Sequence, residues 1–173
     1  MISSKVMALM KGLEISETEL CSELVKQGVA SSLTVSIKQG KIILSGCFSE
    51  DEEQTLILES RGVFFAPRGA KEVVFRVLGK NEKQNREIDR VVSELALAIA
   101  KKLWGSFIDF GAKGLRPPVS RDGDMFRVDL RDIPVVRSKA SEPWRSMLDL
   151  IRLQDLVTEP GKLVLRLSPI KSL

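Results

Sequence analysis

The chain has 173 residues, 43% of them hydrophobic and 29% charged, which predicts a single globular domain over residues 1–173. It contains no His, so it lacks the usual general base near neutral pH, the commonest metal ligand and any Ser–His or Cys–His pair. Residues 1–100 hold 13 basic and 14 acidic side chains, whereas residues 101–173 hold 14 and 9, so an anionic partner should meet the C-terminal half.

The first 30 residues have a helical pattern. Apolar side chains recur at helical spacing between Val6 and Leu13. A second helix start follows at Ser16, where the sequence Ser-Glu-Thr-Glu forms a capping box, and Gly28 offers a stop. We therefore expect short N-terminal helices.

From Leu33 the hydrophobic period changes to two, which is typical of β-strands. Gln39 and Gly40 suit a tight turn between the first two strands. We expect strands at residues 33–37, 41–45, 55–66 and 71–78, the third of them interrupted at residues 59–62.

The most periodic element covers residues 82–104, with Asn81 as its cap. Its apolar residues from Ile88 to Leu103 lie on one helical face, and the segment is roughly 35 Å long as a helix. Further along we expect a strand at 126–131 that is stopped by Pro134, a short helix over 143–151, a turn at 159–162 and a last strand at 163–167. The predicted fold class is α+β, with a curved antiparallel sheet packed on one long amphipathic helix.

Nucleotide-binding motifs are absent from the sequence. Gly62 and Gly69 are separated by six residues instead of four, Lys71 is not followed by Ser or Thr, and there is no Gly-x-Gly-x-x-Gly fingerprint. The one Ser-x-x-Lys match, at Ser168, is followed by Pro169 and falls at the end of the chain. We therefore expect no catalytic residue and no cofactor.

Four aspartates, at positions 122, 124, 129 and 132, form the densest acidic set in the basic half. Such a set suits an oxygen-ligand metal site or acid–base chemistry. Arginines are interleaved with them and the closing Glu of a calcium loop is missing, so we favour a solvated turn and a charged strand face, with no metal.

Cys21 and Cys47 have neither metal nor redox spacing, which suggests two buried thiols in a reduced compartment. The apolar run from Val6 to Met10 is shorter than the core of a secretory signal, and no run reaches the length of a membrane span. We therefore expect a cytoplasmic protein.

Two groups of residues are candidates for binding. Large apolar side chains in and after the Gly- and Pro-rich stretch 104–119 suit either a ligand pocket or the end of the core, and they are Trp104, Phe107, Phe110, Leu115 and Phe126. Basic side chains that suit an anionic headgroup or a phosphate, or else ordinary solvation, are Arg116, Arg121, Arg127 and Arg131.

The order of the elements resembles that of the bacterial lipid-binding proteins of the tubular lipid-binding (TULIP) superfamily. The resemblance rests on a capped helix at residues 15–20, strands at 33–37 and 41–44, the long helix, and a late strand at 163–167. It implies a long helix wrapped by a curved sheet and an apolar lining for lipid. It implies no particular site residue, because no fixed motif carries it.

We therefore expect a non-catalytic module that binds an apolar ligand or a membrane lipid surface. One alternative is an RNA- or DNA-binding module that uses the Arg-rich stretch 116–145, whose affinity would fall as salt rises. Another is a structural interaction protein, such as a homodimer that pairs a helix face or a strand edge.

Overall fold

Two antiparallel sheets and three helices make up the part of the chain that the structure describes. The structure is a computed structural model, and it describes residues 13–48, 53–79, 85–111, 116–139, 148–149 and 151–167. The helix expected between Val6 and Leu13, the cap at Asn81 and most of the helix expected at 143–151 lie outside these residues. Leu13 itself begins a strand.

The N-cap at Ser16 is confirmed, while the Glu19 carboxylate of the predicted capping box accepts a hydrogen bond from Lys102. Strand β1 (Leu13–Ser16) leads directly into α2 (Glu17–Lys26), and the Oγ of Ser16 accepts a hydrogen bond of 3.1 Å from the N–H of Glu19. Leu20 and Leu24 of this helix are buried.

The fold class α+β with antiparallel pairing is confirmed, but the strands form two sheets where one was expected. The larger sheet has the order β2 (Leu33–Lys38), β3 (Lys41–Gly46), β4 (Gln54–Phe65), β5 (Lys71–Leu78), β7 (Met125–Asp129) and β6 (Ser120–Asp122). The smaller sheet has the order β1, β9 (Lys162–Leu167) and β8 (Leu153–Glu159).

Hydrogen bonds among Glu17, Ile37 and Gly161 tie the two sheets together. The N–H of Gly161, in the turn before β9, donates to the carbonyl of Ile37 in β2, and the N–H of Glu17 donates to the carbonyl of Gly161. The Oε1 of Glu17 in turn accepts from the N–H of Ile37. These bonds cover the open edge of β2, which would otherwise present unpaired backbone groups.

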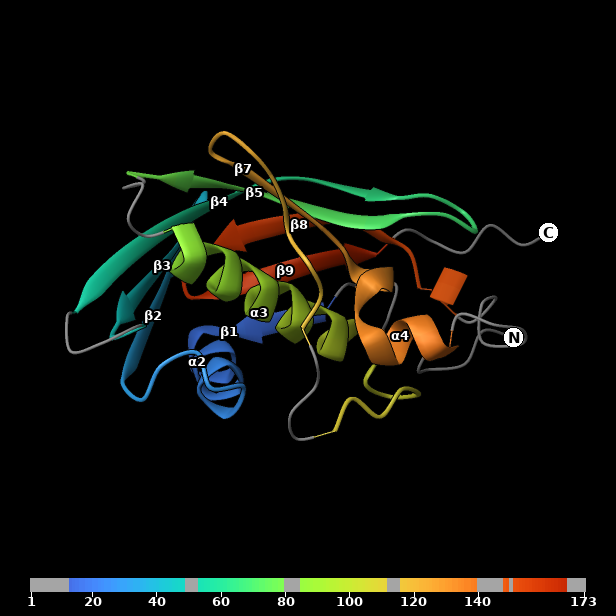
Figure 1. Ribbon diagram of the computed structural model, residues 1–173, viewed down its shortest axis with the longest axis horizontal. Helices are drawn as coiled ribbons and strands as arrows, with labels where there is room; N and C mark the ends of the chain where they lie inside the picture. The colour runs from blue at the N-terminus through green and yellow to red at the C-terminus, as the bar shows by residue number, and fades with distance from the viewer. Residues whose placement is uncertain are drawn as a thin grey trace.

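Helix α3 (Asn85–Trp104) lies in the middle of the molecule, in front of the smaller sheet in the view of Figure 1. Ile88, Val92, Leu95 and Ile99 are all 0% exposed, as the predicted apolar face requires. From residue 91 to residue 100 every position is buried, including Glu94. This stretch is therefore enclosed on all sides, unlike a surface helix with one apolar stripe.

Strand β4 runs without a break through residues 59–62, where an interruption was predicted. Its pairing with β5 shifts between Ser60 and Gly62, so Arg61 is the extra residue of a β-bulge. One extra residue exchanges the two faces of a strand. Leu58 before the bulge and Phe65 after it therefore both face the core, although their spacing is odd.

The chain after β7 differs from expectation. Leu130 begins a single 3₁₀ turn, η2 (Leu130–Asp132), so the strand ends at Asp129, before the predicted alternation reaches Arg131. Pro134, expected only to end the strand, is the first residue of α4 (Pro134–Lys139), where a missing N–H costs nothing.

Candidate functional site

The predicted aromatic binding residues divide into two groups. Trp104 and Phe126 are 0% exposed, and the Trp104 ring stacks on Phe65 with the centroids 6.3 Å apart. These two side chains belong to the core, so they do not line an open pocket. Leu115 lies outside the described residues.

Phe107 and Phe110 lie at a cavity beyond the C-terminal end of α3. The cavity has a volume of about 780 Å³ and is open to solvent, and it also includes Ile108 in its lining. Phe110 and Ile108 are buried and Phe107 is half-buried against the core. The helix ends here because the N–H groups of Phe107 and Ile108 both turn back to the carbonyl of Trp104. That turn places the apolar side chains side by side at the cavity.

Charged side chains form the other part of the cavity lining. Lys101 of α3 forms an ion pair of 2.7 Å with Glu23 of α2. The side chain of Lys26 is exposed and forms no hydrogen bond or ion pair with another residue that the structure describes. Asp109 accepts a hydrogen bond from the N–H of Gly111. The cavity therefore combines an apolar part with polar groups of both signs.

Each of the four arginines predicted to contact an anion lies beside a carboxylate. The closest distances are Arg116–Glu94 4.0 Å, Arg121–Asp89 3.9 Å, Arg127–Glu72 3.4 Å and Arg131–Asp129 3.1 Å. The structure does not bring the four together on one surface element, since they come from the 116–119 segment, β6, β7 and η2. Local pairing of this kind matches the ordinary solvation that the sequence left as an alternative.

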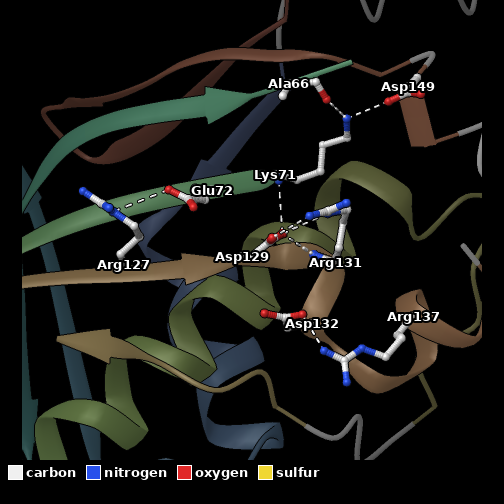
Figure 2. A network of polar contacts seen from close by, with 9 residues as sticks. All are labelled: Ala66, Lys71, Glu72, Arg127, Asp129, Arg131, Asp132, Arg137 and Asp149. Carbon is white, nitrogen blue, oxygen red and sulfur yellow. Dashed lines mark hydrogen bonds and ion pairs between the residues drawn. The ribbon is translucent and has the colours of Figure 1, made fainter. Parts of the chain in front are cut away.

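A network of polar contacts lies where β5 meets η2 and the Asp149 segment (Figure 2). Its centre is Lys71, which is 3% exposed. The Lys71 Nζ donates to Asp149 at 2.6 Å and to the carbonyl of Ala66, and it lies 5.9 Å from the centre of the Phe65 ring. A Lys this deeply buried is rare unless its charge is paired. The arrangement holds the end of the β4–β5 hairpin against the following segments.

Asp129 receives most of the donors in this network. It accepts hydrogen bonds from the backbone N–H groups of Lys71 and Arg131 and from the Arg131 guanidinium. Burial alone would raise the pKa of the Asp129 carboxyl, but these hydrogen bonds and the Arg131 charge outweigh burial and lower the pKa below its ordinary value. Asp129 is therefore held as a carboxylate.

Glu94 shows the opposite balance. It lies on the enclosed part of α3 and accepts a hydrogen bond of 2.8 Å from Nε2 of Gln27 at the end of α2. Burial raises the pKa of the Glu94 carboxyl, and the bond from Gln27 and the charges of Arg116, Lys101 and Arg90 do not fully offset it.

The predicted acidic set is spread over ion pairs. Asp124 pairs with Arg76, Asp129 with Arg131, and Asp132 with Arg137. Over the described ranges, no three acidic or Cys side chains converge as ligands for a metal ion would. The same ranges contain no helix with the length and hydrophobicity needed to cross a membrane.

Cys21 and Cys47 are not fully buried, contrary to expectation. Both are half-buried free thiols, and the Sγ of Cys21 donates to the carbonyl of Leu33 at 3.2 Å. Neither thiol has a His to act as its base, because the chain has no His.

Comparison with protein-family models, with curated proteins and with solved structures finds no match to the chain.

Proposed function

We propose that the protein is a non-catalytic binding module that holds an apolar ligand in the cavity at the C-terminal end of α3. The observation that carries the proposal is the cavity itself, with Phe107, Ile108 and Phe110 in its lining. Its volume of about 780 Å³ lies within the usual range of small-molecule pockets, roughly 300–1,000 Å³. Two of the five aromatic and aliphatic residues predicted from the sequence line it.

The lining indicates the chemistry of the ligand. Three apolar side chains provide contact area, whereas Lys26 and the Glu23–Lys101 pair provide polar contacts at the same cavity. A ligand with an apolar body and one polar end satisfies both parts. A charged metabolite without an apolar body would leave the phenylalanine side chains in contact with water.

The cavity offers apolar side chains to a space that is open to solvent. The interior between α3 and the sheets is filled by buried side chains, none of them more than 9% exposed. We infer that the two sheets act as one curved wall around α3, as in the TULIP proteins that the sequence resembles, with the ligand at the end of the helix.

Binding of a neutral fluorescent probe tests the proposal. N-phenyl-1-naphthylamine should gain fluorescence with the wild-type protein, and palmitate should displace it. Phe107→Ser should weaken probe binding at least about 5-fold, because it removes apolar contact from the cavity. Phe64→Ser is the matched control, since Phe64 is an exposed phenylalanine that does not line the cavity.

The outcomes separate this proposal from its alternatives. Equal probe binding by Phe107→Ser and Phe64→Ser would exclude the cavity as the site. Binding to phosphatidylglycerol vesicles without displacement of the probe would assign the protein to a membrane surface instead. Native mass spectrometry on gently purified protein adds a direct search for a copurified lipid, and thermal melting shows whether each variant is folded.

A further inference from the structure

The outer face of the larger sheet carries an exposed aromatic side chain that the cavity does not use. Phe64 is 59% exposed, the most of any large hydrophobic side chain in the described part of the chain. It stands on β4 directly after the bulge, opposite Glu72 of β5. The neighbouring inward positions, Val63 and Phe65, pack in or against the core, so Phe64 points to the other face.

The ring of Phe64 lies over a glycine. A β-carbon at Gly62 would lie 3.5 Å from Cε2 of Phe64, which is ordinary contact distance, so the ring covers the bare backbone there. Gly62 is opposite Val74 of β5, and Val74 is opposite Arg127 of β7. Phe64 therefore belongs to a small surface patch on three adjacent strands, which we call the Phe64 patch: Arg61, Gly62, Phe64, Glu72 and Arg127, with the buried Val74 beneath them.

Arginines are the outermost charges of the Phe64 patch. The side chain of Arg127 is 58% exposed and that of its partner Glu72 is 26% exposed; for Arg61 and Glu59 the values are 49% and 23%. Figure 2 shows Arg127 reaching from β7 to Glu72 on β5. The distances of 3.4 Å and 3.8 Å are ion-pair contacts between one nitrogen and one oxygen. A guanidinium has five N–H donors, so such contacts leave both arginines able to bind a further anion.

We propose that the Phe64 patch is a stacking platform for single-stranded nucleic acid. A base stacks on the Phe64 ring, and the phosphates on either side of it meet Arg61 and Arg127. Stacking needs an exposed ring with a rigid support, and an aromatic on a sheet face provides both. A protein partner is less well matched, because an apolar anchor from a protein needs a pocket, and three cavities lined by described residues include no residue of this patch.

The rigid support comes from the network behind the hairpin. Lys71 and Phe65 fix the inner side of the same hairpin end through Asp149 and the Trp104 ring. The patch is thus presented in one geometry before a ligand arrives, which lowers the entropic cost of binding. This site is separate from the cavity at the end of α3, so a failed test of one proposal does not contradict the other.

Fluorescence anisotropy with a labelled oligothymidylate of about 12 nucleotides tests the proposal at about 50 mM and about 200 mM salt. We expect binding at low salt that weakens as salt rises. Phe64→Leu keeps apolar area but removes the π face, and it should raise Kd by about 5-fold to 100-fold. Phe64→Trp should keep or strengthen binding. Arg127→Gln should reduce the slope of log K against log salt by about 0.7.

Matched controls make each result decisive. Arg137→Gln removes the same charge from α4, outside the patch, and should change the slope less than Arg127→Gln does. Phe107→Leu, at the cavity, should leave oligonucleotide binding unchanged. The proposal is overturned if no binding occurs at low salt, if Phe64→Leu binds as well as the wild type, or if a duplex of equal length binds as tightly as the single strand. Self-association that Phe64→Leu abolishes, without oligonucleotide binding, would assign the patch to a second copy of the chain and would also overturn it.

Discussion

The Nζ of Lys71 lies 2.6 Å from Oδ1 of Asp149, and the two residues are 78 positions apart in the chain. Their environments differ. The Lys71 side chain is 4% exposed, whereas the Asp149 side chain is 24% exposed and also accepts from the N–H of Arg68. The Lys71 charge is therefore costlier to leave without its partner than the Asp149 charge, which can reach water.

We expect Asp149→Ala to be more destabilising than Lys71→Met. Removal of Asp149 leaves a buried ammonium with only the carbonyl of Ala66 and the face of Phe65, and an uncompensated buried charge costs about 3 kcal/mol or more. Lys71→Met keeps the volume, and the remaining carboxylate can reach water, so we expect a loss of about 1 kcal/mol. Urea unfolding of both variants measures the two free energies. Equal losses, or a larger loss for Lys71→Met, would contradict the unequal burial.

Asp129→Asn should remove a pH-dependent part of the stability. The pKa of Asp129 is lower in the folded protein than its ordinary value of 3.8, so the folded state favours the carboxylate. The resulting stability is complete well above pH 3.8 and is lost as pH falls through the lower, folded pKa. The variant should therefore be less stable than the wild type at pH 7, by about 1–3 kcal/mol, and the difference should shrink below pH 3.8.

Unfolding at a series of pH values measures this difference, with Asp122→Asn as the control. Asp122 is exposed on β6 and makes no hydrogen bond or ion pair with Arg131 or Lys71, so its removal should not change the stability with pH in the same way. If the free energies of unfolding of wild type and Asp129→Asn differ by the same amount from pH 7 to pH 3, the hydrogen bonds to Asp129 do not stabilise the fold through its charge.

Glu94→Gln should act in the opposite sense. The pKa of Glu94 is raised in the folded protein above its ordinary value of 4.5, so the folded state binds this proton more tightly than the unfolded chain does. Stability therefore falls as pH rises from 4.5 through the raised pKa. Gln removes the cost of ionising a buried carboxyl and can still accept a hydrogen bond from Gln27. The melting temperature of the variant at pH 7 should therefore equal or exceed that of the wild type. Any gain in melting temperature should disappear near pH 4. A melting temperature several degrees lower at pH 7 would show that the charge of Glu94 is needed by Arg116 and Lys101.

Local signals were enough to predict several elements. The β2–β3 hairpin, β5 and the cap of α2 agree with expectation because each depends on residues within a few positions of one another, as at Gln39–Gly40 and Ser16–Glu19. Strand β8 was not predicted, because a register shift between Leu153 and Asp155 breaks its alternation. Leu153 and Leu156 are both buried, and their spacing of three is not the period of a regular strand.

The candidate sites were harder to predict for a related reason. Phe107 and Phe110 could be proposed from the sequence because a run of large apolar residues among glycines is unusual in itself. Lys71, Glu94 and Phe64 were missed because their roles depend on partners far along the chain or on the bulge at Arg61. The arginine partners were also invisible, since the Arg116–Glu94 and Arg127–Glu72 pairs each join residues that only the fold brings together.

Gly62 sets the geometry of the bulge and provides the last prediction. Its φ is +146°, a conformation that costs a residue with a β-carbon about 1–3 kcal/mol. Phe64 would lie 3.5 Å from the new methyl group, which is ordinary contact, so the expected loss in Gly62→Ala comes from the backbone.

Gly40→Ala is the matched control for this variant. Gly40 has φ +81° in the β2–β3 turn and would meet no atom within 4 Å, so alanine there carries only the left-handed penalty of about 1 kcal/mol. We expect Gly62→Ala to lower the free energy of unfolding more than Gly40→Ala does, because its φ is much less accessible to alanine. The larger loss should come with weaker amide protection in residues 62–65, where the bulge keeps Val63 and Phe65 directed toward the core. If both variants lose the same stability and Phe65 remains protected, the bulge tolerates a β-carbon and does not depend on glycine.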